Sequence, residues 1–521
     1  MKPRKRLRTS PITGVGGEES ESLRPLDTTN QPRLTLVGSG RISNAISASL
    51  ALNNRELNKQ IAELKKSDDG SASLHAKMQK LSDSIVKISI LGRPPEDGKP
   101  TSESYAVFKK YGIDITYSRT VVDGKEIETK EHIGPDEFEV ITTNPQDILR
   151  LQNHIFMTIQ AQDCDLAAYT RLKPLRSDNT TISVGQNGIP FWLAYKNREG
   201  KEQCINPVRD DPIVSEIGSD NLYAAVLNIA CQDHKDKEGR LTYIVSTPQH
   251  KQTIPVGDIL NQHSNCSSKL HTIFNSAGLH SEVTMKGIKG EVWQKLQFNI
   301  IVNALSALYD CTIKDLVDKY PLVLETLADE VDNLYRQPNV SGDSKGLRPW
   351  PNLMERLERS KGHTTTMCQD YNKGKPIEFE AIYGLILILE DAVKGREFII
   401  PHVRKLAVIL NTMLDKRGEL MPGKSNVKDA ANEARDSVIP LLEKFVSDIG
   451  GCVRRPTPLP TKEPFMPHIS GTEECKNSGD VPRSHSAPLP AIKIKETPAP
   501  SAQLPRLEKV VSVKGVSGRG R

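Results

Sequence analysis

The feature that most limits the possible folds is a change of secondary-structure pattern near residue 266. Before it, short apolar runs rich in β-forming residues alternate with helical stretches, which is typical of an α/β fold with a mostly parallel sheet. From about residue 267 to 449 long helical patterns take over. We therefore predict an α/β domain at 33–265 and an all-α domain at 266–450. The predicted strands are Leu34–Val37, Val86–Leu91, Phe138–Thr142, Ile155–Ile159, Thr181–Val184, Ala224–Ile229 and Tyr243–Val245.

The first predicted strand runs into a glycine-rich turn. In a dinucleotide-binding fingerprint the first glycine makes the tight turn, the second lets the backbone approach a pyrophosphate, and the next helix N-terminus attracts the phosphate charge. A serine stands at the third glycine position here, where its side chain is expected to crowd the contact between helix and strand. The residues of the turn and the helix start are Gly38, Ser39, Gly40, Arg41, Ile42 and Ser43.

The second strand ends in a basic residue. It reads Lys87-Ile-Ser-Ile-Leu-Gly-Arg93, whereas NAD-binding sheets usually carry an acid at this place. An arginine there can hold a 2′-phosphate through a charge-assisted hydrogen bond. The sequence therefore predicts a Rossmann-type domain that prefers NADP(H) to NAD(H).

One amine and two amides share a stripe of an otherwise apolar helix. Lys295, Asn299 and Asn303 are four residues apart, and such steps drift by only about 40° around a helix. The neighbouring positions are apolar on nearly every side, as in a buried helix. A buried lysine must find partners or lose its proton, which suits an acid or base in catalysis. The spacing alone supports a structural alternative equally well. In it, Lys295 extends its amine to the surface, and the two asparagine side chains are hydrogen-bonded within the core.

Five motifs, in this order, resemble ketopantoate reductase, and the resemblance covers about 33–50 and 85–415. The motifs are the strand with its GxG turn, the strand end Ile90–Arg93, Gln186-Asn187-Gly188 after a strand, the helix Trp293–Asn303, and Thr366-Met-Cys-Gln-Asp370 followed by Glu378.

The resemblance implies NADPH-dependent reduction of a 2-keto acid, 2-dehydropantoate (ketopantoate) to pantoate, as in pantothenate biosynthesis. Lys295 would donate a proton to the keto oxygen, and Glu378 would hold the lysine and a substrate hydroxyl. Without the family pattern, Glu378 would be a helix-surface acid and Thr366 one of three threonines capping a helix. The implied substrate-binding residues are Asn187, Asn299, Asn303 and Thr366, whose hydroxyl would bind the substrate carboxylate. The implied cofactor-binding residues are Gly38, Ser39, Gly40, Arg41, Ile42, Arg93, Gln160 and Asn187.

The chain departs from the family in two further places. Gln160 stands where the family commonly has a lysine that helps to bind the cofactor phosphate. Residues 52–84 form an insertion with two apolar stripes at helical spacing around a polar break, which predicts a helical hairpin. Two alternatives therefore stay open: a catalytically weakened nucleotide-binding or interaction module on the same fold, and a reductase of another 2-keto acid. The stripes are Leu57, Ile61, Leu64 and Leu74, Met78, Leu81.

The net charge of +5 comes from the two ends of the chain. Basic residues exceed acidic ones by three in 1–33 and by six in 451–521, which leaves about −4 for the body. Residues 1–32 and the proline-rich residues 451–521 are too poor in apolar side chains to bury a core, so we expect disordered basic tails. Nucleic acid is not the expected partner. A protein partner of the proline-rich tail and a homodimer both stay open.

No apolar run approaches the roughly 20 residues of a membrane span, and the basic start has no apolar stretch behind it. We therefore expect a cytoplasmic protein. The eight cysteines are scattered without metal-ligand spacing, which predicts free thiols and no metal site.

Overall fold

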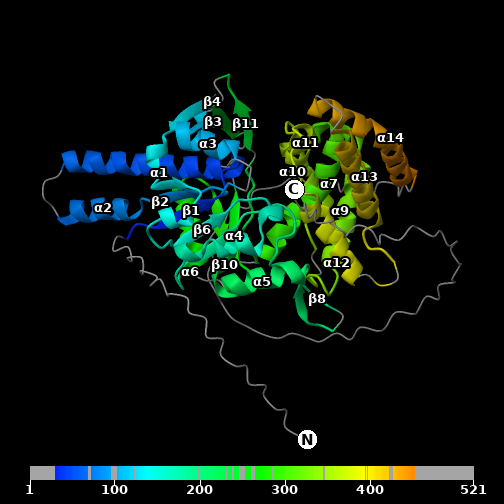
Figure 1. Cartoon of the computed structure of the whole chain (residues 1–521), viewed down its shortest axis with the longest axis horizontal. Coiled ribbons are helices and arrows are strands. Elements are labelled where there is room, and N and C mark those ends of the chain that lie inside the picture. The colour runs from blue at the N-terminus through cyan, green and yellow to red at the C-terminus, as the bar shows by residue number, and fades with distance from the viewer. Residues whose placement is uncertain are drawn as a thin grey trace, which may run out of the picture. The chain divides into compact units, whose positions relative to one another are not determined.

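The computed structural model describes residues 30–451 apart from short gaps (Figure 1). The tails predicted to be disordered lie almost wholly outside the described residues. By their contacts the described residues all belong to one compact unit. The gaps are 68–71, 96–101, 123–124, 198, 230, 238–239, 246–252, 260–264, 284–286, 344–345, 394, 396 and 422–425.

An eight-stranded sheet forms the centre of the N-terminal part. Its order is β14-β13-β10-β7-β6-β1-β2-β5, and all neighbours are parallel except β10 and β13. The central strands β1, β6 and β7 are buried along their whole length and mostly apolar, as a parallel sheet with both faces covered requires. The strands are Arg33–Val37 (β1), Lys87–Leu91 (β2), Val140–Thr142 (β5), His154–Met157 (β6), Thr181–Val184 (β7), Leu222–Ala225 (β10), Ile254–Asp258 (β13) and Ser281–Val283 (β14).

A second sheet, of four strands in the order β11-β12-β3-β4, was not predicted. The run Tyr243–Val245, which we assigned to the main sheet, belongs to β12 of this smaller sheet, because β12 pairs with β3 and β11. Its strands are Ile113–Val122 (β3), Lys125–Ile133 (β4), Cys231–Lys235 (β11) and Leu241–Val245 (β12), and a separate hairpin joins Ala194–Lys196 (β8) and Glu202–Cys204 (β9).

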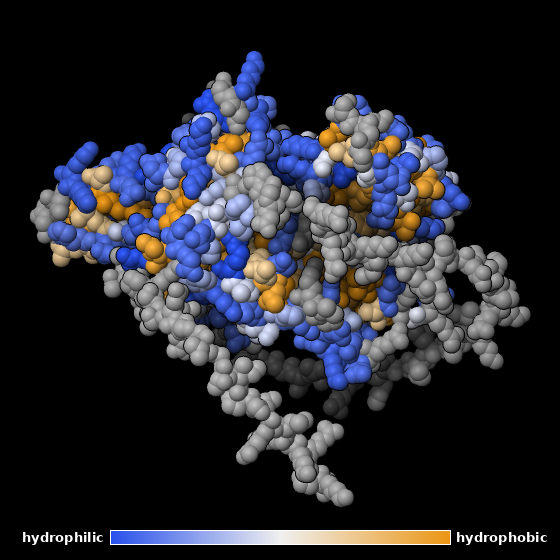
Figure 2. All heavy atoms as spheres, in the orientation of Figure 1, coloured by the Kyte–Doolittle hydropathy of each residue, from blue (hydrophilic) through white to orange (hydrophobic). Residues whose placement is uncertain are grey.

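The insertion at 52–84 is a helical hairpin, as predicted, but it does not begin as a separate helix. One unbroken helix, Arg41–Lys66 (α1), carries both the first turn after the GxG sequence and the first arm of the hairpin, and Ala72–Asp83 (α2) is the second arm. Asn54 fixes the base of the hairpin, since its side chain bonds both the N–H and the carbonyl of Val86 (3.0 and 2.8 Å). The arms project from the sheet (Figure 1), and Figure 2 shows apolar surface along them between polar edges.

The α/β part extends past the predicted boundary at 265, because β14 lies in the main sheet and the helix before it packs against β13 and β14. The division into two domains stays a prediction, while the fold class is confirmed: a Rossmann-type sheet with helices, then an all-helical part. The helices of the first part, besides α1 and α2, are Glu103–Tyr111 (α3), Leu166–Thr170 (α4), Pro207–Ile217 (α5) and Asn265–Ser276 (α6).

The helical part is built around the helix with the polar stripe, Ile288–Tyr309 (α7), which is buried along most of its length. A π-helical turn, Glu380–Gly384, leads into Leu385–Val393 (α12). The other helices are Ile313–Lys319 (α8), Pro321–Tyr335 (α9), Trp350–Arg359 (α10), Thr366–Asn372 (α11), Pro401–Leu420 (α13) and Val427–Gly451 (α14).

Three findings concern the described residues only. Their cysteines (164, 204, 231, 311 and 368) are free thiols, and their His, Cys, Asp and Glu side chains form no group that could hold a metal ion. None of their helices is long and apolar enough to cross a membrane.

Candidate active site

The GxG turn has the geometry that a dinucleotide needs. Gly38 has φ +115°, and a Cβ there would lie 3.0 Å from Thr158 Oγ1, so only glycine fits. Gly40 is the N-cap of α1, has no side-chain cap, and would place a Cβ in open space. The first N–H groups of α1 therefore have no side-chain cap, and the backbone at Gly40 leaves room for a ligand, which suits a pyrophosphate.

Ser43 does not disturb the turn. Its side chain is buried, and its hydroxyl donates to the carbonyl of Gly38 at 2.8 Å. The amide of Asn44 donates to the carbonyl of Ser39 at 3.1 Å, and the hydroxyl of Ser39 contacts that of Ser102 at 3.2 Å. Ser43 thus stabilises the turn, because its hydroxyl has a backbone carbonyl as acceptor.

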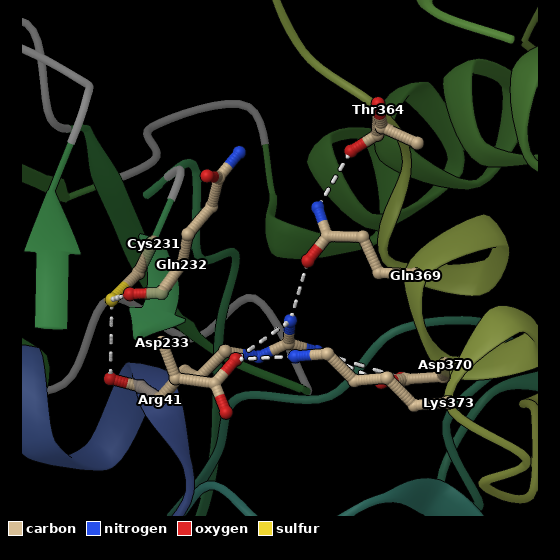
Figure 3. Close-up of polar contacts among 8 residues, drawn as sticks. All are labelled: Arg41, Cys231, Gln232, Asp233, Thr364, Gln369, Asp370 and Lys373. Carbon is tan, nitrogen blue, oxygen red and sulfur yellow. Dashed lines mark hydrogen bonds and ion pairs between the residues drawn. The ribbon is translucent and has the colours of Figure 1, made fainter. Parts of the chain in front are cut away.

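Arg41, the first residue of α1, reaches across to the helical part (Figure 3). Its Nη1 donates to Gln369 Oε1 at 2.8 Å, and its Nη2 lies 3.2 Å from Asp370 Oδ1, both on α11. Asp233 of β11 lies 3.8 Å from the same guanidinium and accepts from Lys373 at 2.9 Å. Arg41 thus links the nucleotide turn, the small sheet and the helical part.

The two acids beside Arg41 differ in their titration. Burial raises the pKa of Asp370 above its ordinary value, although the charge of Arg41 opposes this shift. Burial also raises the pKa of Asp233, but the hydrogen bond from Lys373 and the charge of Arg41 outweigh it and leave that pKa lowered. Sequence reasoning missed Asp233 and Lys373, because nothing in their local pattern indicates that a distant strand meets α11.

Arg93 lies beyond the end of β2 with its side chain about half exposed (51%). Its guanidinium is paired with Asp163, an acid on the loop that begins at Gln160 after β6. Arg93 and Gln160, both predicted to bind the cofactor phosphate, therefore belong to facing loops. Arg93 already has an anionic partner. An open surface hollow of about 540 Å³ lies next to this region and is lined by Pro94 and Arg171 but by none of the predicted site residues.

The catalytic candidates come together from three segments. Lys295 of α7 donates from Nζ to the carbonyl of Leu227 at 2.8 Å. Asn187 donates from Nδ2 to Glu378 Oε2 at 2.9 Å. The direct contact between Lys295 and Glu378 that the resemblance implies is not formed, and the amine instead bonds the carbonyl of Leu227.

Burial shifts the pKa of both Lys295 and Glu378. It lowers the pKa of Lys295 to about 8, against the opposing charge of Glu378 and with help from Arg356. Burial raises the pKa of Glu378, while Asn187 and Lys295 lower it. The charges of Arg41 and Asp370 also act on Glu378, so the nucleotide turn and the catalytic candidates share one electrostatic environment.

Asn187 is held in place by the glycine that follows it. Gly188 has φ +78°, and a Cβ there would lie 2.4 Å from the carbonyl oxygen of Ala381 in the π-helical turn. The next N–H, of Ile189, donates to the same oxygen at 2.7 Å. This close approach fixes the Gln-Asn-Gly loop against the segment that carries Glu378.

The remaining predicted residues differ in exposure. Asn299 and Asn303 are buried (8% and 5% exposed), and Nδ2 of Asn299 has no hydrogen-bond partner in the described part of the chain. Thr366 is exposed at the start of α11, and the helix cap is Thr365, whose hydroxyl accepts from the N–H of Cys368 at 3.3 Å. The hydroxyl of Thr366 is therefore not used as the cap.

Arg356 of α10 was not predicted and lies close enough to lower the pKa of Lys295. Its Nη2 donates to Asn228 Oδ1 at 2.8 Å, and its guanidinium lies over the ring of Phe298, 4.7 Å from the centroid. No motif of the sequence marks this arginine, because α10 follows α7 only after two further helices.

The chain is similar to several known proteins. Residues 287–401 match a family model described as ketopantoate reductase PanE/ApbA C terminal. The 2-dehydropantoate 2-reductase of Mesorhizobium japonicum is 25% identical over 277 residues, which cover 50% of this chain and 78% of that protein. The one of Yersinia pestis is 24% identical over 133 residues, or 26% of this chain and 41% of that protein. A crystal structure from Ralstonia solanacearum, described as a proposed ketopantoate reductase, has the same fold, with a TM-score of 0.53, 17% identity, and coverage of 74% of this chain and 99% of that one.

Proposed function

Because residues 287–401 match the C-terminal model of the ketopantoate reductase family, we propose that the chain is an oxidoreductase that reduces a 2-keto acid with a nicotinamide dinucleotide. The substrate that we propose first is 2-dehydropantoate, reduced to pantoate, with NADPH as cofactor. This is the activity named for the relatives from Mesorhizobium japonicum and Yersinia pestis.

The observation that carries the proposal is the amine of Lys295, whose pKa burial lowers to about 8. Reduction of a keto group builds negative charge on the carbonyl oxygen. An ammonium beside that oxygen stabilises the charge and supplies the proton, and it does so best when its pKa lies near the working pH. A surface lysine would keep its proton and would be a weaker acid.

The nucleotide turn fits the cofactor. The open backbone at Gly40 and the uncapped start of α1 would hold the pyrophosphate, and Arg41 would add a positive charge beside it. The cofactor, when bound, supplies the hydride. The chain itself supplies the proton and the orientation of the substrate.

The neighbours of Lys295 would position the substrate. Glu378, fixed by Asn187, would accept a hydrogen bond from a substrate hydroxyl and keep the amine charged. The unpartnered amide nitrogen of Asn299 has a donor left for a substrate oxygen. The exposed hydroxyl of Thr366 is free of the capping role that would otherwise occupy it.

The proposal is tested by following NADPH oxidation with a panel of 2-keto acids, ketopantoate first, for the wild type and Lys295→Ala. We expect the variant to lose ~10²–10⁴-fold in kcat, because a general acid contributes about this much. Its affinity for NADPH should stay the same, since the amine acts on the alkoxide. Lys289→Ala, in the first turn of the same helix, is the matched control. A Lys295→Ala variant with nearly full turnover would refute the role of this residue.

One observation favours a second candidate, a nucleotide-binding module with weakened chemistry. Both arginines proposed for the cofactor phosphates are already paired with acids, Arg41 with Asp370 and Arg93 with Asp163. Such pairs compete with a phosphate for the guanidinium. Binding of NADPH by calorimetry without turnover of any 2-keto acid in the panel would favour this candidate over the reductase.

A further inference from the structure

Two cations from different helices are anchored to neighbouring residues of one loop. Lys295 of α7 donates to the carbonyl of Leu227, and Arg356 of α10 donates to the side chain of Asn228, both at 2.8 Å. The loop follows β10, which runs parallel to β7, so it lies at the carboxyl edge of these strands. Ligands of open α/β sheets bind at this edge.

Arg356 is a partly buried cation without an acidic partner. Within the described part of the chain no carboxylate lies within 4 Å of its guanidinium, whose contacts are the amide of Asn228 and the ring of Phe298. Burial and the charges of Arg348 and Arg359 lower its pKa to about 10, against the charge of Glu291. A guanidinium has five N–H donors, so most of its fork stays available to a ligand.

We propose that Arg356 and Lys295 form one anion subsite, in which Arg356 binds the carboxylate of a 2-keto acid while Lys295 faces its keto oxygen. The inference rests on the proposed reductase function and deepens it. In a 2-keto acid the carboxylate carbon is bonded directly to the keto carbon, so the groups that hold the two must be neighbours. The planar fork of an arginine matches a carboxylate with two parallel hydrogen bonds.

The charges around Lys295 give the substrate a direction. Glu378 and Arg356 both act on the pKa of Lys295, the first by raising it and the second by lowering it. A substrate carboxylate is repelled by Glu378 and attracted by Arg356, so it lies at the end of the site where Arg356 stands. The rest of the substrate, with any hydroxyl, then points towards Glu378. This assignment moves the carboxylate away from Thr366, the residue that the family resemblance indicates for it.

The test compares Arg356→Gln with Arg359→Gln, a substitution of the same kind on the same helix at a side chain that is 63% exposed. With the 2-keto acid that the wild type reduces best, Arg356→Gln should raise KM by about 10–100-fold, the effect of losing a charge-assisted contact, with a smaller change in kcat. A ketone of similar size without a carboxylate should show no such difference, and Arg356→Lys should restore part of the affinity. Arg359→Gln should behave as the wild type, and NADPH affinity should be unchanged in all variants.

A KM that stays unchanged in Arg356→Gln but rises in Thr366→Ala would overturn the inference. Binding of oxamate, an unreactive 2-keto acid analogue, measured by calorimetry with NADPH present, separates this outcome from a failure of the proposed function. If the wild type reduces no 2-keto acid but binds oxamate, and Arg356→Gln does not, the reductase proposal fails and the subsite stands. Equal oxamate binding by both proteins, or none by the wild type, overturns the subsite. Circular dichroism checks the fold, and the uncharged Arg356→Met replaces the glutamine variant should that one not fold.

Discussion

At the scale of single residues, the site depends on how much water each charge has lost. Lys295 has a carbonyl, a distant carboxylate and a neighbouring guanidinium around it, and burial outweighs them all in setting its pKa near 8. Glu378 shows the opposite shift for the same reason, because burial disfavours the charged form of an acid as it does that of an amine. Each shift moves the pKa of its group towards neutral pH, where a group that transfers protons works best.

This shift predicts the pH dependence of the reaction. The amine must carry its proton to act as the acid, so kcat/KM for reduction should fall about tenfold per pH unit above a pKa of about 8. The free energy of unfolding should rise with pH over the range in which kcat/KM falls. Between about pH 8 and 10.5 the unfolded chain keeps the proton that the folded chain has lost, so this residue adds stability as pH rises. The measurement is a pH–rate profile, and a limb near pH 8 that persists in Lys295→Ala would assign the titration to another group.

Arg93 decides the choice of cofactor in our proposal. Arg93→Ala should weaken NADPH about tenfold and leave NADH nearly unchanged, because only NADPH carries the 2′-phosphate, and the effect is limited by the half-exposed position and by the pairing with Asp163. Asp163→Asn should do the reverse and strengthen NADPH. Dissociation constants for both cofactors, by calorimetry, give the answer. Equal weakening of NADPH and NADH in Arg93→Ala would mean that the arginine is structural.

The sequence identified residues better than it identified their partners. Lys295, Asn187 and Glu378 were found because a helical stripe and family motifs mark them, and the structure brings them together. Leu227, which accepts from the lysine, and Arg356 carry no local signal. Their roles come from loop and helix positions that are fixed only when the chain has folded.

At the scale of elements, the Gln-Asn-Gly loop and the π-helical turn act as one unit. Gly188→Ala should lower the Tm by several degrees and reduce kcat, because a φ of +78° and a Cβ 2.4 Å from the carbonyl of Ala381 force the loop away and misplace Asn187. Gly200→Ala is the matched control, since Gly200 has a φ of +75° but nothing within 4 Å of its Cβ position. The difference between the two variants isolates the contact with the π-helical turn. Equal effects on kcat would show that this contact does not position Asn187.

Elements with a strong local period were predicted well, and those without one were missed. The buried strands β1, β2 and β7 and the polar-striped α7 lie within a residue or two of their predicted positions where positions were predicted. The small sheet was missed, because β3 and β4 are interrupted by polar residues and β3 pairs with β12, a strand that is distant in the sequence. Continuous helical propensity from Arg41 onwards also explains why α1 runs through the predicted start of the insertion.

At the scale of the whole molecule, contacts between distant segments complete the site. Arg41 begins α1 but is bound by α11 and faces β11, so the nucleotide turn is tied to the helical part by one side chain. The fingerprint predicted a cofactor role for Arg41, yet its acidic partners could not be read from local patterns. The fold class, a Rossmann-type sheet followed by helices, was predicted correctly, while the contacts that link the two depend on tertiary packing.

The last prediction concerns the segment beyond this compact unit. Ending the chain at residue 454 should leave the Tm and kcat of the protein nearly unchanged, because the core of residues 30–451 is closed by α14, whose Val438, Leu442 and Phe445 are at most 2% exposed. Ending it at residue 426 instead removes α14 and exposes its contacts with α13 and α9, and each large apolar side chain lost from the core costs about 1.5–3 kcal/mol of unfolding free energy. That shorter chain should melt far lower or fail to fold. Calorimetric melting of the three proteins distinguishes the cases, and a large drop in Tm already at 454 would mean that the removed segment packs on the body.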